Sequence, residues 1–421
     1  MKVSGTAQVP GDKSISHRAL ICASLATGVS SIRGLLQSED VQSTAGVLRS
    51  LGVSIPSLAS EISIDGVGLR GLRKSRLALQ CGNSGTTTRL LAGVASACPF
   101  ASRFEGDASL SRRPMKRIAE PLTAMGARFE FDRDDGLPMT IHGGDLSGIA
   151  WHTRASSGQT KSAILLAGLV AGVSVTVREN TRSRDHTERM LASLGVSLEI
   201  GDTSVSLSPA ATLDPLDISI PADPSSAAFP MALGALAQLG EVRINELCVN
   251  PTRTGFIRVL ERMGASVRFL DKKTSAGEPI ATVVVSPRTL KGTHITADEV
   301  PSMIDELPMI GCLAAASGVS IDVSGAEEMR VKESDRISVL VGNLRAIGAE
   351  AEEKRDGFRI PAQSRRPLRG RVATQADHRI AMAFGVLSFL DGNSIEIDDR
   401  DCVAISYPNF WTDLGALVQG P

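Results

Sequence analysis

The stretch Asp12–Ala26 reads DKSISHRALICASLA, a polar lead-in followed by an apolar run of small residues. This pattern predicts a helix that begins near the lead-in. Five further segments share the plan, and their lead-ins are Gly82–Arg89, Ser156–Lys161, Asp223–Ser226, Ile304–Glu306 and Ala376–Arg379. A helix N-terminus carries unpaired N–H groups and the positive end of a dipole. Several such ends facing one cleft would therefore bind an anionic small molecule without a metal.

A second repeated feature is a glycine at the end of a predicted helix. The five glycines are Gly52, Gly126, Gly195, Gly264 and Gly348. Glycine is favoured there because it adopts the left-handed conformation that ends many helices. The glycines recur every ~70 residues, a longer period than the usual solenoid unit of ~20–50 residues. Each repeat is therefore long enough for a βαβαββ-like unit, and six repeats fit the chain.

Predicted strands, such as Arg128–Phe131, alternate with predicted helices, such as Arg112–Met125. The predicted fold class is α/β (α+β), with antiparallel strand pairs inside each repeat. The polar stretch Lys272–Glu278 is predicted to be a hairpin loop. Six repeats are expected to form two groups of three, because one core rarely grows past ~250–300 residues. The two prolines of Ile220–Pro224 favour a hinge near the middle of the chain.

Composition argues against several classes of protein. The formal net charge of −1 gives no general attraction to nucleic acid or membranes, and 3% aromatic residues disfavour a base-stacking surface. The apolar run Ala163–Val173 is shorter than the ~20 residues of a membrane span. The six cysteines form no C-x-x-C pair, which favours reduced thiols and a cytoplasmic location. No signal or transit peptide is expected before the first motif.

Several charged segments are candidates for chemistry. Asp12–Arg18 places a lysine and an arginine in the first turns of one helix, and Gly82–Arg89 combines glycines with hydroxyls. Gly106–Lys116 contains arginines suited to bidentate contacts with carboxylate or phosphate. Each segment also has an ordinary interpretation, such as a solvated helix start, a capped turn or a basic patch. Likewise, Asp305 could serve as a helix cap, and Arg330–Arg336 could form ion pairs on a helix face.

Taken together and in this order, the segments resemble the enolpyruvyl transferase family, and within it the 5-enolpyruvylshikimate-3-phosphate synthases. The resemblance runs from Val9 to Phe410. The matching blocks are Asp12–Leu20, Gly82–Arg89, Gly106–Pro114, Ser157–Ser162, Ser183–Met190, Arg330–Arg336, Asp377–Met382 and Ser406–Phe410.

The resemblance implies a two-domain inside-out α/β barrel built from six βαβαββ repeats, three per domain. One domain would span residues 13–222 and the other residues 1–12 plus 223–421, with the active site in the cleft between them. The implied reaction joins phosphoenolpyruvate to the 5-hydroxyl of shikimate 3-phosphate and releases phosphate, a step toward chorismate and the aromatic amino acids. No cofactor, metal, nucleic acid or membrane is implied, and the family suggests a monomer.

The resemblance also assigns roles to residues. Lys13 would contact both substrates and assist proton transfer, Asp305 would accept the proton of the 5-hydroxyl, and Glu333 would protonate and later deprotonate C3. The implied substrate-binding residues are Arg113, Arg336 and Arg379 for phosphoenolpyruvate, Ser14, Arg18, Ser157, Arg184 and Lys332 for shikimate 3-phosphate, Gln159 between the substrates, and Asn83 and Gly85 at the phosphoenolpyruvate pocket. Gly85 implies inhibition by glyphosate, since tolerant relatives carry Ala there.

Two alternatives remain at this point. The sister enzyme, UDP-N-acetylglucosamine 1-carboxyvinyltransferase, normally has Lys-Asn where this chain has Lys13-Ser14, and a cysteine in the loop that corresponds to Asp107–Arg113. A catalytically dead phosphometabolite-binding homologue is the second alternative, and retention of Lys13, Asp305 and Glu333 argues against it. The chain also lacks, in Val403–Pro408, a lysine that some family members carry there.

Overall fold

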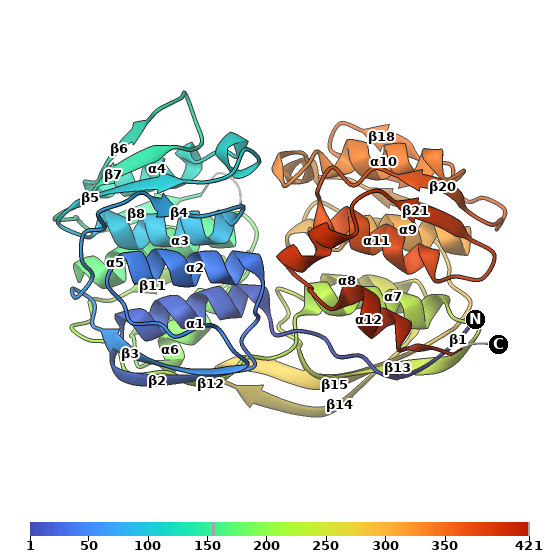
Figure 1. Cartoon of the computed structure of the whole chain (residues 1–421), viewed down its shortest axis with the longest axis horizontal. Coiled ribbons are helices and arrows are strands. Elements are labelled where there is room, and N and C mark those ends of the chain that lie inside the picture. The colour runs from blue at the N-terminus through green and yellow to red at the C-terminus, as the bar shows by residue number, and fades with distance from the viewer. Residues whose placement is uncertain (154–155, 420–421) are drawn as a thin grey trace. The chain divides into compact units, whose positions relative to one another are not determined.

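The computed structural model describes residues 1–153 and 156–419, which fold into two compact units. Unit 1 comprises Met1–Pro10, Pro221–Thr274 and Pro279–Pro421. Unit 2 comprises Gly11–Ile220 and Ser275–Glu278. Figure 1 shows unit 2 in blue to green and most of unit 1 in yellow to red.

A βαβαββ repeat is built from one continuous segment of chain three times in the described residues. In unit 2 the first copy consists of β4 (Leu79–Gln80), α3 (Gly85–Ser96), β5 (Ala101–Glu105), α4 (Lys116–Met125), β6 (Arg128–Phe131) and β7 (Met139–His142). The second copy consists of β8 (Ile149–His152), α5 (Gly158–Ala171), β9 (Val175–Arg178), α6 (His186–Ser193), β10 (Leu198–Ile200) and β11 (Ser204–Leu207). In unit 1 the third consists of β16 (Thr293–Ile295), α9 (Leu307–Ser317), β17 (Ile321–Val323), α10 (Arg336–Ala346), β18 (Glu352–Lys354) and β19 (Gly357–Ile360).

Each of these sheets has the same topology. The strand orders are β4-β5-β7-β6, β10-β11-β9-β8 and β16-β17-β19-β18. In every case the first two strands along the chain are parallel and the last two form an antiparallel hairpin. The common topology confirms the repeat that was predicted from the sequence.

The other three repeats vary this plan. One runs through β1 (Lys2–Thr6), α7 (Pro224–Leu236), β13 (Leu239–Cys248), α8 (Gly255–Arg262), β14 (Ser266–Ser275) and β15 (Glu278–Ser286), with β22 (Val418–Gln419) added beside β1. A second combines β12 (Asp217–Ser219) with α1 (Lys13–Leu25), β2 (Thr27–Arg33), α2 (Glu39–Ser50) and β3 (Glu61–Val67). The last has β20 (Arg369–Val372), α11 (His378–Ser388), β21 (Ser394–Ile397) and α12 (Phe410–Gly415).

The core of each unit is built around helices of small residues. In unit 1, α7, α9 and α11 contact one another pairwise and are buried along most of their length. In unit 2, α1, α3 and α5 are buried to a similar extent. A methyl group at Gly93 would lie 2.2 Å from the backbone oxygen of Ala163, so α3 and α5 pack through bare backbone. The two-domain α/β fold of six repeats, three in each unit, is confirmed.

The predicted helix ends are present. The five glycines have positive φ between 80° and 122°, as the left-handed end requires. Five of the six lead-ins supply an N-cap whose side chain accepts a backbone N–H, namely Asp12, Ser84, Ser157, Asp223 and Asp377. The sixth, Glu306 at α9, makes no such bond.

Two local predictions were wrong. The helix expected at Arg112–Met125 begins only at Lys116, because the extended residue Arg113 and the following proline separate it from a short 3₁₀ turn, Leu110–Arg112. The hairpin loop expected at Lys272–Glu278 is mostly strand, since β14 continues to Ser275 and β15 begins at Glu278. Only Ala276 and Gly277 form the turn, and both have positive φ.

Candidate active site

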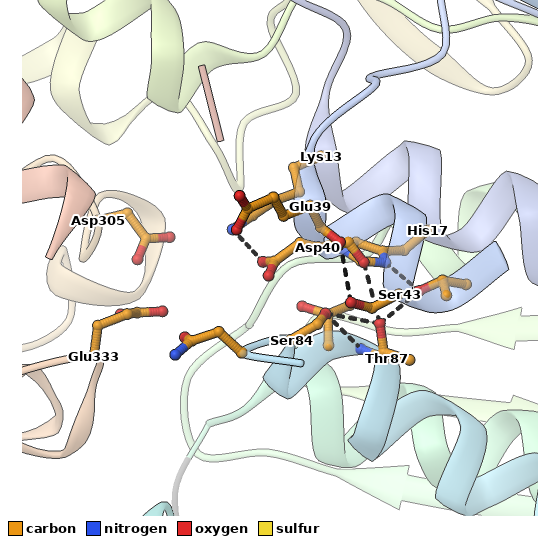
Figure 2. Close-up of polar contacts among 12 residues, drawn as sticks. Lys13, His17, Glu39, Asp40, Ser43, Ser84, Thr87, Asp305 and Glu333 are labelled. Carbon is orange, nitrogen blue, oxygen red and sulfur yellow. Dashed lines mark hydrogen bonds and ion pairs between the residues drawn. The ribbon is translucent and has the colours of Figure 1, made fainter. Parts of the chain in front are cut away.

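The N-terminal turn of α1 carries the first cluster of candidate residues. The ammonium nitrogen of Lys13 lies 3.0 Å from a carboxylate oxygen of Asp40, at the start of α2, and Figure 2 shows this ion pair. The ion pair holds the ammonium in place, while 17% of the Lys13 side chain remains exposed. Ser14 lies in the same turn and is half-buried.

Arg18 lies one turn further along α1 and is almost fully buried. Its guanidinium donates to the hydroxyls of Thr187 (2.7 Å) and Ser162 (2.8 Å) and to the backbone oxygen of Ser14 (2.9 Å). Burial lowers the pKa of Arg18 to about 10, opposed by the charge of Glu188. Arg18 therefore remains cationic at neutral pH, fixed between α1, α5 and α6.

The lead-in to α3 supplies a second cluster in unit 2. Asn83 donates to Asp107 (2.6 Å) and accepts from Arg113 (2.5 Å), which orients the Arg113 guanidinium. Gly85 begins α3 directly beside these groups. A methyl at Gly85 would lie 2.9 Å from Nη1 of Arg89 and 3.4 Å from Nη1 of Arg113. Glycine is therefore required here to leave the two guanidiniums undisturbed.

The start of α5 adds Ser157 and Gln159. The Ser157 hydroxyl caps the helix by accepting the N–H of Thr160 (3.4 Å). The Gln159 side chain accepts from Arg89 (2.7 Å) and donates to Thr86 (3.0 Å), so α3 fixes its orientation. Gly158 packs on Arg184, since a methyl there would lie 3.1 Å from the Arg184 backbone oxygen. Arg184, which precedes α6, is half-buried. We call these candidate residues of unit 2 the Lys13 half-site.

Unit 1 holds the remaining candidates, and two of them pair with the buried guanidinium of Arg336 at the start of α10. Arg336 donates to Asp305 (3.1 Å), to Glu333 (2.5 Å) and to Asp377 (2.8 Å). Burial alone would lower the pKa of Arg336, but the charges of Asp377, Glu333 and Asp305 outweigh burial and hold its pKa above the ordinary value. The two predicted proton-transfer acids, which Figure 2 labels, therefore accept from the two terminal nitrogens of one permanent cation, Arg336.

Arg379, in the first turn of α11, is a buried cation with incomplete hydrogen bonding. Its side chain is 3% exposed, and its Nε and Nη1 have no hydrogen-bond partner among the residues that the structure describes. Burying guanidinium N–H groups without hydrogen-bond partners is energetically costly, so this arrangement is typical of an anion-binding site. Lys332, at the end of a 3₁₀ turn before Glu333, is half-buried. These residues of unit 1 form the Arg336 half-site.

The cationic side chains of the two half-sites suit anionic ligands. Within residues 1–153 and 156–419, no group of three or more His, Cys, Asp or Glu side chains could hold a metal ion. No helix of the described chain is long and apolar enough to cross a membrane. The six cysteines are free and buried.

Of the predicted site residues, nine lie in unit 2 and five in unit 1. The structure adds three positioning residues that were not singled out from the sequence: Asp40 on Lys13, Arg89 on Gln159, and Asp377 on Arg336. Arg89 and Asp377 both lie within quoted lead-ins, so a polar residue inside a lead-in was the available signal. Asp40 had no such signal, because its pairing with Lys13 joins two helices.

Known proteins resemble this chain over almost its whole length. The family model described as EPSP synthase (3-phosphoshikimate 1-carboxyvinyltransferase) matches residues 1–414. Proteins named 3-phosphoshikimate 1-carboxyvinyltransferase match nearly end to end. The Sulfurihydrogenibium sp. protein is 44% identical over 98% of this chain and 97% of its own. The Persephonella marina protein is 43% identical over 99% of this chain and 98% of its own.

Solved structures give the same picture. EPSP synthase from Acinetobacter baumannii has a TM-score of 0.86 and 39% identity, covering 99% of this chain and 96% of its own. The enolpyruvyl transferase NikO from Streptomyces tendae, at 17% identity and a TM-score of 0.77, shares the fold. The chain therefore belongs to the EPSP synthase (3-phosphoshikimate 1-carboxyvinyltransferase) family.

Proposed function

We propose that Lys13, Asp305 and Glu333 carry the proton transfers by which this chain moves the enolpyruvyl group of phosphoenolpyruvate to the 5-hydroxyl of shikimate 3-phosphate. Enolpyruvyl transfer with release of phosphate, in the biosynthesis of chorismate and aromatic amino acids, is the reaction of its family. The observation that supports these roles best is the placement of Asp305 and Glu333 on one buried guanidinium, Arg336.

The chemistry proceeds by addition and elimination. The 5-hydroxyl oxygen attacks C2 of phosphoenolpyruvate, Asp305 takes the hydroxyl proton, and Glu333 delivers a proton to C3. The resulting tetrahedral intermediate then loses phosphate from C2, and the phosphate takes up the proton that Asp305 had accepted, while Glu333 takes a proton back from C3. The Lys13 ammonium stabilises the negative charge and assists proton transfer, held for that task by Asp40.

The cations divide between the two substrates. Arg113, Arg336 and Arg379 bind the phosphate and carboxylate of phosphoenolpyruvate, with Asn83 and Gly85 shaping that pocket. The shikimate 3-phosphate ligands are Ser14, Arg18, Ser157, Arg184 and Lys332, and Gln159 lies between the substrates. Nε and Nη1 of buried Arg379 have no hydrogen-bond partner in the described part of the chain, which supports this assignment because an anion would satisfy them.

We further propose domain limits of residues 13–222 for one domain and residues 1–12 plus 223–421 for the other, with both half-sites acting on the same pair of substrates. The chain is proposed to work as a cytoplasmic monomer. Six reduced, buried cysteines are consistent with the cytoplasm.

The test is phosphate release by purified protein. Phosphoenolpyruvate is supplied with shikimate 3-phosphate and, separately, with UDP-N-acetylglucosamine. We expect release only with shikimate 3-phosphate, its loss in Glu333→Gln, and its retention in the matched control Glu327→Gln, an exposed acid of the neighbouring 3₁₀ turn. Release only with the sugar nucleotide, or equal activity in both variants, would overturn the proposal.

A further inference from the structure

A buried hydrogen-bonded chain lies behind the Lys13 half-site. Nδ1 of His17 lies 2.6 Å from the Thr44 hydroxyl, which lies 2.6 Å from the Thr87 hydroxyl, which donates to the Ser84 hydroxyl at 2.7 Å. All four side chains have 0% exposure. The chain thereby joins the first turns of α1 and α3 to α2, and Figure 2 shows His17, Thr87 and Ser84 in place.

The order of donors follows from counting protons. The Ser84 oxygen accepts both the N–H of Thr87, at 3.2 Å, and the Thr87 hydroxyl proton. Each hydroxyl has one proton. Because Thr87 has given its proton to Ser84, Thr44 must donate to Thr87, and His17 must donate to Thr44. His17 is therefore the neutral tautomer that carries its proton on Nδ1.

The surroundings of His17 agree with a neutral ring. Burial, followed by the charges of Lys13 and Arg18, holds the pKa of His17 well below its ordinary value. Its Nε2 has no partner in the part of the chain that the structure describes. With the proton on Nδ1, the unpaired group is an acceptor, and a buried acceptor without a partner is tolerated better than a buried N–H.

Three residues of this hydrogen-bonded chain lie within about one helical turn of a residue of the proposed site. Two of those site residues, Lys13 and Gly85, are proposed to act on substrate, and the third, Asp40, holds Lys13. His17 lies four residues after Lys13 in α1, and Thr44 lies four residues after Asp40 in α2, so each pair shares a helix face. Thr87 lies two residues after Gly85 at the start of α3. Fixing the three links therefore fixes the Lys13–Asp40 ion pair against the Gly85 backbone.

We propose that Thr44 and Thr87 are positioning residues for the transfer reaction, acting through the chain to hold Lys13, Asp40 and Gly85 in one rigid arrangement. Neither hydroxyl has accessible surface or a spare proton for substrate. This inference rests on the proposed role of Lys13 and deepens it, since it names what holds that ammonium in place.

The main test compares Thr44→Val with Thr44→Ser. Valine keeps the shape but removes the hydroxyl, so Nδ1 of His17 loses its partner and Thr87 keeps its bond to Ser84 but loses the one to Thr44. Buried polar groups that lose a hydrogen-bond partner are unfavourable, so the first turns of α1 and α3 should shift. We expect kcat/KM for phosphoenolpyruvate to fall about tenfold or more. The KM for shikimate 3-phosphate should change less than about twofold, because Arg18 is held separately by Thr187 and Ser162. Serine, which restores the hydroxyl, should return most of the activity.

The matched control is Ser24→Ala, which removes a buried hydroxyl from the far end of α1, where it bonds to Leu20. It should lower the melting temperature without changing either kinetic constant. A Thr44→Val protein that is only less stable, with unchanged kcat and both KM values unchanged, would show a merely structural role and overturn the proposal. Inactive wild-type protein would instead refute the proposed function.

A second measurement does not depend on whether the variants fold. Nitrogen-15 NMR of the wild-type histidines, with His17 assigned through His17→Gln, reports which ring nitrogen is protonated. We expect the His17 proton on Nδ1 at neutral pH. A proton on Nε2 would reverse the donor order and overturn the proposal.

Discussion

Asp377 is the residue whose loss should disturb unit 1 most. It is 0% exposed and accepts from Nε and Nη2 of Arg336, from the Ser334 hydroxyl and from the N–H of Arg379. The substitution Asp377→Asn keeps the shape, removes the charge and points an N–H₂ group toward donors. It thus breaks a buried ion pair and disturbs the cap of the helix that carries Arg379.

The magnitude follows from burial. Removing one partner of a buried ion pair costs about 3–5 kcal/mol. Glu333 and Asp305 remain on Arg336 but are 16% and 18% exposed, so they compensate only in part. We therefore expect a loss near the lower end, about 3 kcal/mol. For a unit of roughly 200 residues, about 2–4 °C per kcal/mol gives a fall in melting temperature of about 6–12 °C. Because Arg336 also loses its orientation, kcat/KM for phosphoenolpyruvate should fall about a hundredfold or more.

The assay is scanning calorimetry with steady-state phosphate release on the same preparations. The matched control is Asp271→Asn, which weakens an exposed ion pair with Arg243 in unit 1. Exposed pairs contribute about 0–1 kcal/mol, so this variant should melt within about 4 °C of the wild type and remain active. Equal melting temperatures for the two variants would refute the view that Arg336 depends on Asp377.

Three further predictions concern other parts of the molecule. The unfolding free energy of unit 2 should fall as pH drops below about 6.5, because folded His17 stays neutral while the unfolded chain takes up a proton. The contribution of His17 to this pH dependence is at most about 1.4 kcal/mol per pH unit. Urea unfolding of His17→Gln at several pH values should show a smaller dependence of the unfolding free energy on pH. An unchanged dependence would contradict burial of the neutral ring. The native thiols should resist a disulfide reagent at about pH 8 and react after unfolding. The reason is that burial raises the pKa of Cys22, Cys81 and Cys402 to about 12 and that of Cys98 to about 11. Rapid reaction of the folded protein would contradict this prediction. Glyphosate should compete with phosphoenolpyruvate. The substitution Gly85→Ala should raise the inhibition constant of glyphosate roughly tenfold, since the added methyl would crowd Arg89 and Arg113. Equal inhibition constants for the wild type and the variant would contradict this view of the pocket.

Local signals in the sequence predicted the scaffold well. The glycines that end helices and the lead-ins that begin them depend on backbone geometry within a few residues, so the pattern of residue types is sufficient. The strand Arg128–Phe131 is found at its predicted limits for the same reason. The hairpin at Ser275–Glu278 was misjudged because polar residues in an exposed two-stranded extension resemble those of a loop.

The contacts that orient the site were harder to predict. The Lys13–Asp40 pair, the Arg89–Gln159 bond and the chain from His17 to Ser84 each join helices that are separated by tens of residues. No local pattern specifies such pairings, because they depend on how the repeats pack. The family resemblance supplied residues that would touch substrate, whereas the residues that hold them became evident only from the structure.

The most direct test of addition followed by elimination is product analysis in deuterium oxide. Phosphoenolpyruvate labelled with carbon-13 at C3 is mixed with shikimate 3-phosphate, and the product is examined by NMR. The mechanism predicts an enol ether product that carries solvent deuterium on C3, because Glu333 adds one hydrogen and later removes one; Glu333→Gln should form neither product nor exchanged phosphoenolpyruvate. A product without deuterium at C3, or full exchange in Glu333→Gln, would contradict the proposed role of this residue.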